Sequence, residues 1–321
     1  MKRSILVSMV VAALSVVPRT AELCDGFLPQ NNMKIPIGSY EAKGISQQQF
    51  NEVMDRMEAI YGPEIKARGG TLVLKRLWDN GTVNASAQRS GNNYILNMYG
   101  GLARHESITQ DGMALVVCHE MGHHIGGAPK YGGGNDWASN EGQSDYFANM
   151  KCLRRMFSGE GASFTRPKGD DAGPRAACAA SFKSESDRAV CVRGSMAGMS
   201  VTTLFRVLRG ETVLPRFDTP DPAVVSRMYD AHPGTQCRLD TYFAGSVCAR
   251  AVSDEVDGTN PATGTCTPAG GQTSGFRPLC WYKPGVDGIP PATEPAIAQR
   301  EHPQTPALVS SLQNPELWLG Q

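Results

Sequence analysis

A run of apolar residues, Met113 to Cys118, leads directly into the sequence His119-Glu120-Met121-Gly122-His123. Thr109 favours a helix start before this run, and the glycines after Ile125 favour a helix end. The sequence therefore predicts a helix from about Thr109 to Ile125. Because the run is apolar on every side, we expect this helix to be buried beside a cleft and not to lie on a solvated surface.

Two histidines that are four positions apart lie on the same face of a helix, so His119 and His123 can bind one metal ion. Glu120 lies about 100° further round the helix. From there it can take a proton from a metal-bound water without ligating the metal. This spacing is the signature of zinc-dependent peptidases. The alternative, an ordinary solvated helix, is disfavoured by the apolar run.

A catalytic zinc ion takes three protein ligands and a water molecule, so a third ligand is needed. A third histidine six residues after His123 is excluded, because Pro129 stands there. Glu141 and Asp145 lie four apart in a predicted helix from about Ser139 to Phe157. Glu141 can bind the metal, and Asp145 can orient a ligating histidine. An acidic first helical turn would explain the same pair, but beside the upstream motif we expect Glu141 to be the third ligand of one Zn²⁺ per chain.

The amino terminus has the pattern of a secretory signal peptide over residues 1–21. Lys2 and Arg3 precede an apolar stretch that ends before Pro18. This stretch is short for a transmembrane helix, although an uncleaved anchor is an alternative. We therefore expect an exported protein, periplasmic or secreted, with no transmembrane segment after signal cleavage.

Nine cysteines also indicate an oxidising compartment, and the odd number leaves at least one cysteine outside intramolecular pairs. Cys118 either pairs with Cys152, joining the two motif helices, or is a small buried apolar residue. Sequence does not determine the other pairs. Our hypotheses from proximity are Cys178 with Cys191, Cys237 with Cys248, and Cys266 with Cys280.

Composition and periodicity predict a predominantly helical α+β fold with a small N-terminal sheet and an active-site helix pair. Equal numbers of basic and acidic residues, 31 of each, argue against a nucleic-acid partner. We expect one domain over residues 22–252 and a Gly/Pro-rich extension and tail over residues 253–321. Further helices are predicted over 46–61, 175–192, 195–209, 221–230 and 236–250, and strands over 71–78, 84–87 and 93–98.

Several short motifs together resemble the gluzincin zinc metallopeptidases of the CAAX-prenyl-protease and heat-shock-protease type. These motifs are His119 to His123, then Glu141 and Asp145, an Asn84-Ala85 pair on a strand, and His232-Pro233 followed by Arg238. The set spans residues 84–238, about half the chain. The membrane helices of that family are missing, Ser144 stands where many members have alanine, and the carboxy-terminal third has no counterpart.

The resemblance implies a zincin-like metallopeptidase fold and further roles. His232 would donate to the oxyanion in catalysis, and Arg238 would support it or hold Asp145 or Glu141. Asn84 and Ala85 would bind the backbone of an extended polypeptide substrate, such as a misfolded envelope or extracellular protein. A plain His-Pro turn and a plain turn asparagine are the alternatives. The expected activity is zinc-dependent endopeptidase, and the competing hypotheses are an exported chaperone or binding protein and a purely structural zinc site.

Overall fold

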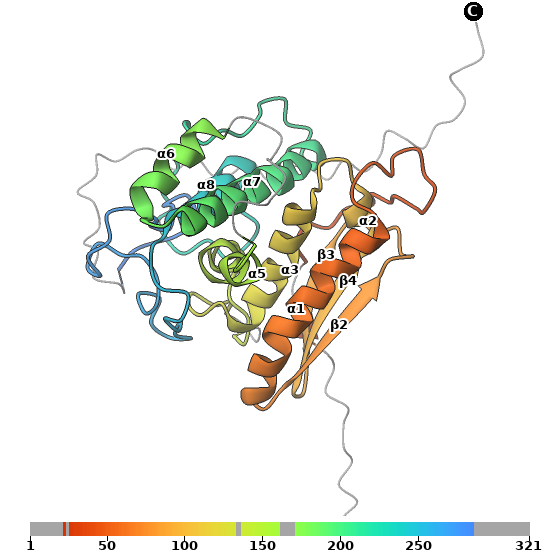
Figure 1. Ribbon diagram of the computed structural model, residues 1–321, viewed down its shortest axis with the longest axis horizontal. Helices are drawn as coiled ribbons and strands as arrows, with labels where there is room; N and C mark the ends of the chain where they lie inside the picture. Colours follow the sequence, from red (N-terminus) through yellow and green to blue (C-terminus); the bar gives the residue numbers. More distant parts are fainter. Residues whose placement is uncertain (1–21, 24–25, 133–135, 161–170, 286–321) are drawn as a thin grey trace, which may run out of the picture.

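A computed structural model describes residues 22–23, 26–132, 136–160 and 171–285. The predicted signal peptide, Cys24 and the final Pro-rich tail lie outside the described residues. The fold is α+β, as predicted, with a small sheet and a larger number of helices. Figure 1 shows the sheet and helix α1 on one side of helix α3, and helices α6, α7 and α8 on the other.

The sheet has the strand order β1-β3-β4-β2. Strands β3 (Ala85–Ser90) and β4 (Asn93–Tyr99) form an antiparallel hairpin through Gly91, whose φ of 56° suits a tight turn. Strand β2 (Thr71–Leu77) pairs parallel with β4, and β1 (Glu22–Leu23) pairs antiparallel with β3. The predicted strands are confirmed, and β1 is additional.

Helix α1 (Gln47–Ala67) begins at a capping box in which Ser46 and Gln49 satisfy each other's backbone N–H groups. The helix continues past Pro63 and so extends beyond the predicted end at Tyr61. Its last turn is stabilised by burial, because Tyr61 and Ile65 are both fully buried. A short helix, α2 (Gly100–Arg104), follows the sheet.

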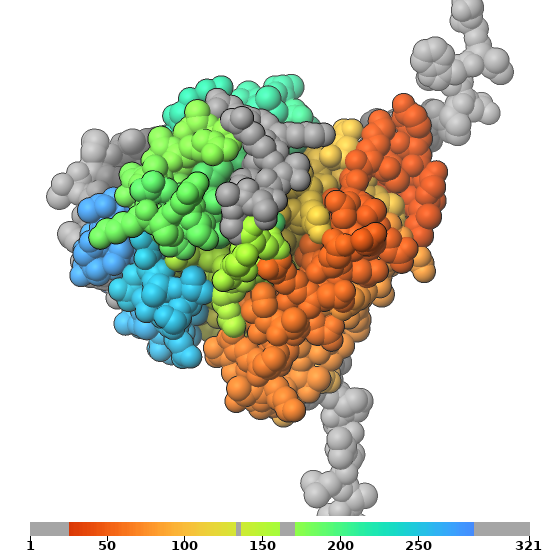
Figure 2. Space-filling model, viewed as in Figure 1, coloured from red at the N-terminus to blue at the C-terminus, as the bar shows by residue number. Residues whose placement is uncertain are grey.

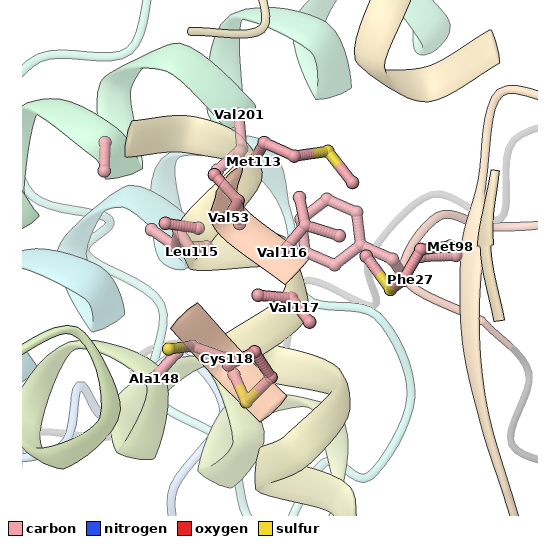
Figure 3. Packing of buried hydrophobic residues seen from close by; sticks show 14 of the residues in the cluster. Phe27, Val53, Met98, Met113, Leu115, Val116, Val117, Cys118, Ala148 and Val201 are labelled. Atoms are coloured by element: carbon pink, nitrogen blue, oxygen red, sulfur yellow. The ribbon is translucent and has the colours of Figure 1, made fainter. Parts of the chain in front are cut away.

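Helix α3 (Gln110–Ile125) lies at the centre of the molecule, as its apolar run predicts. Thr109 caps it by accepting a hydrogen bond from the Gly112 N–H. Its apolar side chains pack against five different parts of the fold. Figure 3 shows Met113, Leu115, Val116, Val117 and Cys118 packed with Phe27, Val53 of α1, Met98 of β4, Ala148 and Val201 of α7.

The second motif helix is continuous but changes its winding. It runs through α4 (Glu141–Phe147), a π-helical turn, Ala148–Cys152, and α5 (Leu153–Met156), close to the predicted range. Cys152, which ends the π turn, forms a disulfide with Cys118 of α3. The hypothesis that a disulfide joins the two motif helices is therefore confirmed.

The later helices are α6 (Ala172–Ser181), α7 (Glu185–Leu208) and α8 (Thr235–Val247). The predicted break between two helices near residue 194 is wrong, because the chain breaks at Phe182 and Ser184 caps α7 instead. The helix predicted over 221–230 is also wrong. There the Val225 and Tyr229 N–H groups donate to the Leu279 and Trp281 carbonyls, so these backbone groups bind another segment.

Residues 253–285 contain no helix or strand but pack closely on the rest of the fold. Trp281 is fully buried, and its indole N–H donates to the Thr241 hydroxyl. The ring lies against Gly142 of α4, where a Cβ would come within 2.2 Å of it. A second buried cluster joins Trp281 and the nearby cysteines to Tyr146 and Met150 of the second motif helix.

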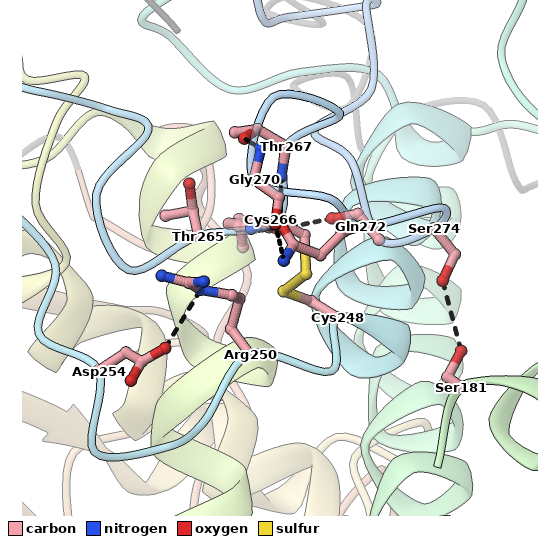
Figure 4. The surroundings of a disulfide bond; sticks show 12 residues. Ser181, Cys248, Arg250, Asp254, Thr265, Cys266, Thr267, Gly270, Gln272 and Ser274 are labelled. Atoms are coloured by element: carbon pink, nitrogen blue, oxygen red, sulfur yellow. Dashed lines mark hydrogen bonds and ion pairs between the residues drawn. A yellow bond between two sulfur atoms is a disulfide. The ribbon is translucent and has the colours of Figure 1, made fainter.

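Four disulfides are present among the described residues, and the Cys178–Cys191 pair is confirmed. The hypotheses of Cys237 with Cys248 and Cys266 with Cys280 are wrong. Cys237 pairs with Cys280, 43 residues away, and Cys248 pairs with Cys266 (Figure 4). The return of segment 279–282 onto α8 places Cys280 beside Cys237, an arrangement that short sequence separation does not reveal. The disulfides indicate an oxidising, exported compartment, and none of the helices in the described residues is both long and apolar enough to cross a membrane.

Candidate metal centre

The two motif helices place three predicted ligands around one point. His119 and His123 project from α3, and Glu141 is the first residue of α4. Their donor atoms all lie within 4.8 Å of one another, and all three side chains are fully buried. Gly122 lets the helices approach closely, because a Cβ there would lie 3.0 Å from the Ser144 Cα. The group can hold a metal ion.

Neighbouring groups fix the orientation of both imidazoles. His119 Nδ1 is 2.7 Å from Asp145 Oδ1, as predicted. His123 Nδ1 is 2.8 Å from the Ser139 carbonyl and 3.0 Å from the Ser144 hydroxyl. With both Nδ1 atoms occupied, each ring presents Nε2 to the centre, which is the usual way in which a protein orients a ligating histidine.

Five buried polar atoms at this centre lack a hydrogen-bond partner among the described residues. They are Nε2 of His119, Nε2 of His123, Oε2 of Glu141 and both carboxylate oxygens of Glu120. An unsatisfied buried polar group costs about 1–3 kcal/mol, so a fold seldom collects several without a ligand. Two imidazoles and a carboxylate suit a borderline divalent cation. The residues therefore fit a bound metal ion.

Arg238 of α8 holds Asp145 from the other side. Its Nε and Nη2 atoms donate to the two carboxylate oxygens at 2.8 and 2.7 Å, and the Tyr242 hydroxyl adds a third bond at 2.7 Å. Burial would raise the pKa of Asp145, but the charges of Arg238 and His119 hold the pKa below its usual value. The Asp145 side chain behind His119 therefore favours its anionic form.

The two glutamates at the centre differ in their proton affinity. Burial raises the pKa of Glu120 to about 8. Burial would also raise the pKa of Glu141, but His232, His123 and His119 hold it well below its usual value. For His119, burial lowers the pKa, and Asp145 and Glu141 together raise it to about 9. The site thus contains one carboxyl suited to remain charged and another suited to exchange a proton.

His232 lies beside the centre, as predicted from the resemblance, although it is not one of the clustered ligands. Its Nε2 is 3.5 Å from Glu141 Oε2 and 2.7 Å from the Gly26 carbonyl oxygen. It is also the most exposed of these side chains, at 9 %. A donor at this position can reach an oxygen that lies next to the metal ligands.

Asn84 and Ala85 contact residues of the same chain at the positions predicted for substrate. Asn84 Oδ1 accepts from the Leu28 N–H at 2.9 Å, and Asn84 Nδ2 donates to the Leu28 carbonyl at 3.1 Å. The Ala85 carbonyl accepts from the Phe27 N–H at 2.9 Å.

Sequence reasoning missed Tyr131 and Tyr242. The Tyr131 hydroxyl donates to Glu141 Oε1 at 2.8 Å, and its ring stacks on His123. Tyr131 lies in a loop, where no periodic pattern could have indicated its role. Tyr242 was detectable, because it follows Arg238 by four positions and so shares its helix face.

A surface cavity of about 910 Å³ lies elsewhere on the molecule. Figure 2 shows the surface on which α1, α5 and the segment near residue 255 meet, and these elements line that cavity. None of the predicted site residues lines it.

The chain matches no protein-family model, no curated protein and no solved structure.

Proposed function

We propose that this protein is a zinc-dependent endopeptidase with a zincin-like fold, related to the gluzincins of the CAAX-prenyl-protease type and exported to the periplasm or secreted. His119, His123 and Glu141 would hold the zinc ion. The donor set supports zinc, because two histidines and a glutamate with one open position form a known catalytic zinc site. Among the described residues, the cluster contains no fourth histidine, cysteine, aspartate or glutamate ligand.

The observation that carries the proposal is the environment of the Glu120 carboxyl group. Its side chain is fully buried beside the ligands, and within the described part of the chain neither of its oxygens has a hydrogen-bond partner. A structural glutamate would be paired, because a buried unpaired carboxyl is costly. A general base needs free oxygens directed at the reacting water, so Glu120 fits that role.

A bound zinc ion supplies Lewis acidity and lowers the pKa of water at the site to about 7. Glu120 then takes a proton from the attacking water and passes it to the departing amine nitrogen. Asp145 holds His119 in one orientation throughout, and Arg238 holds Asp145. His232 donates to the carbonyl oxygen as negative charge develops there, an interaction typically worth about 10²–10³ in rate.

The test compares the wild-type chain with Glu120→Gln on unfolded polypeptide substrates. Glu185→Gln is the matched control, because Glu185 is exposed at the start of α7. We expect Glu120→Gln to lose at least about 10²-fold in turnover and the control to be unchanged. We also expect one zinc ion per chain after purification without chelators. Equal cleavage by all three proteins would refute the catalytic role, and absence of zinc would refute the metal site.

The second candidate is an exported chaperone or binding protein that retains the fold with little proteolysis. One observation favours it: the backbone N–H groups of the chain's own Leu28 and Phe27 donate to the Asn84 side chain and the Ala85 carbonyl, the groups predicted to bind substrate. The same assay separates the two. Binding of unfolded polypeptide without cleavage by the wild-type chain would favour the second candidate.

A further inference from the structure

Residues 22–23 and 26–28 run along the edge of the sheet next to the metal centre. Strand β1 pairs antiparallel with β3, with Glu22 opposite Arg89 and Leu23 opposite Gln88. The Phe27 N–H then donates to the Ala85 carbonyl, at the beginning of β3. An extended peptide that binds a sheet edge makes contacts of this kind. The chain therefore occupies the edge that a peptide would need.

The backbone from Gly26 to Leu28 is bound at each successive residue. His232 Nε2 lies 2.7 Å from the Gly26 carbonyl oxygen. Arg238 Nη1 donates to the Phe27 carbonyl at 2.9 Å. The Leu28 N–H and carbonyl both bind the Asn84 amide. These are the groups to which the resemblance assigned substrate contacts or support of the oxyanion.

The Gly26–Phe27 peptide unit is bound by residues that lie beside the metal centre. His232, which binds the Gly26 oxygen, is 3.5 Å from the ligand Glu141. The Phe27 ring meets the ring of the ligand His119 edge-on, with centroids 5.0 Å apart. The Gly26 carbonyl thus contacts the same His232 side chain that the proposed mechanism assigns to the carbonyl of the bond to be cut.

The side chains fit the same interpretation. Phe27 is fully buried between the rings of His119 and Phe205, in a position suited to a large apolar residue. Gly26 has a φ of 95°, and a Cβ there would lie 3.0 Å from the Ala85 carbonyl oxygen. The first position therefore requires a small residue, and the next position accommodates a large one.

We propose that Gly26 to Leu28 form an internal substrate mimic, with Gly26 and Phe27 on either side of the position of the scissile bond. Peptide substrates with a large apolar residue immediately after the scissile bond must displace this segment before they bind. The inference rests on the proposed peptidase function. It explains why His232 and Arg238 bind backbone carbonyls, which packing of Phe27 and Leu28 in the core does not require.

The first experiment measures displacement and does not depend on turnover. The zinc-loaded Glu120→Gln chain is mixed with a peptide that has the sequence of residues 22–30, with serine in place of the cysteine. A second peptide, with alanine also in place of the phenylalanine, is the control. We expect the first peptide alone to accelerate hydrogen exchange at the Phe27 and Leu28 amides. Unchanged protection of both amides at saturating peptide would overturn the inference.

The second experiment weakens the segment by Gly26→Ala. The matched control is Gly38→Ala, because Gly38 also has a positive φ, 76°, but a Cβ there meets nothing within 4 Å. A strained left-handed residue costs about 1–2 kcal/mol, so we expect Gly26→Ala to bind the peptide about tenfold more tightly than the control does. Equal affinities in two folded variants would count against the mimic. If Gly26→Ala does not fold, the exchange measurement decides.

Hydrolysis is assayed in parallel with Glu120 intact, so that the two proposals can fail separately. Displacement of the segment without hydrolysis by the wild-type or the Gly26→Ala chain would support the mimic and refute the peptidase. Hydrolysis at equal rates by both chains would support the peptidase and refute the mimic. Faster hydrolysis by Gly26→Ala would support both.

Discussion

Arg238 donates two hydrogen bonds to Asp145 across a separation of 93 residues, from Nε at 2.8 Å and from Nη2 at 2.7 Å. The same carboxylate contacts His119 of α3 and accepts a bond from Tyr242 of α8. Asp145 therefore connects α3, α4 and α8 through one buried charge. This connection fixes the position of the metal centre relative to the carboxy-terminal helices.

We expect Arg238→Ala to destabilise the protein by about 3–5 kcal/mol, because it leaves the Asp145 carboxylate buried without its main counter-charge. Urea unfolding measures this change. The matched control is Arg216→Ala, because Arg216 pairs with Asp218 on an exposed surface and such pairs contribute about 0–1 kcal/mol. Equal losses in the two variants would contradict a structural role for the buried pair.

Metal removal should lower stability, because a bound ion satisfies the free Nε2 atoms of His119 and His123. With free zinc at about a thousandfold above its dissociation constant, the stabilisation should be about 4 kcal/mol. Thermal unfolding with and without a chelator measures it. His123→Ala should abolish the difference, whereas His105→Ala should retain it, because His105 binds the Ser107 N–H away from the site. A chelator effect that persists in His123→Ala would argue against this centre.

The ligand set could be predicted from sequence because local rules determine it. A four-residue spacing places His119 and His123 on one helix face, and the same rule applies to Glu141 and Asp145. Strand and helix patterns likewise identified β2, β3, β4 and α3. In these cases the sequence pattern lies within one helix or strand, or in two helices that supply ligands to the same metal ion.

The missed features depend on contacts between distant segments. The N–H groups of Val225 and Tyr229 donate to carbonyls in residues 279–281. These long-range hydrogen bonds replace the ones that a helix over 221–230 would form. Tyr131 reaches Glu141 from an irregular loop. The Phe27 N–H finds its acceptor in a strand that begins nearly sixty residues later. Neither periodicity nor short spacing encodes such contacts.

The disulfide pairing can be checked by peptide mapping under non-reducing conditions. We expect linked peptides that contain Cys237 with Cys280 and Cys248 with Cys266. Replacing Cys237 and Cys280 by serine should cost about 4 kcal/mol, because the bond closes a long loop in the unfolded chain. The shorter Cys178–Cys191 loop, with a separation of 13, should cost about 3 kcal/mol. Linked peptides with Cys237 and Cys248 would contradict the structure.

Asp240 should make stability depend on pH in a mildly acidic range. Burial raises the pKa of Asp240 from 3.8 to about 6, and hydrogen bonds from the Asp221 N–H and Gln236 offset this only in part. The folded state therefore binds the proton more tightly than the unfolded state does. The associated stabilisation is complete below about pH 4 and is lost as the pH rises to about 6.

The test compares urea unfolding of the wild-type chain and Asp240→Asn between pH 4 and pH 7. Asparagine keeps an oxygen that can accept from the Asp221 N–H, and it does not titrate. The stability of the wild type relative to the variant should fall with rising pH, by no more than about 1.4 kcal/mol per pH unit, and should level off above pH 6.5 or so. All groups that titrate equally in both chains cancel in this difference. If the stability of the wild type relative to the variant stays constant or increases with pH, burial does not raise the pKa of the Asp240 carboxyl.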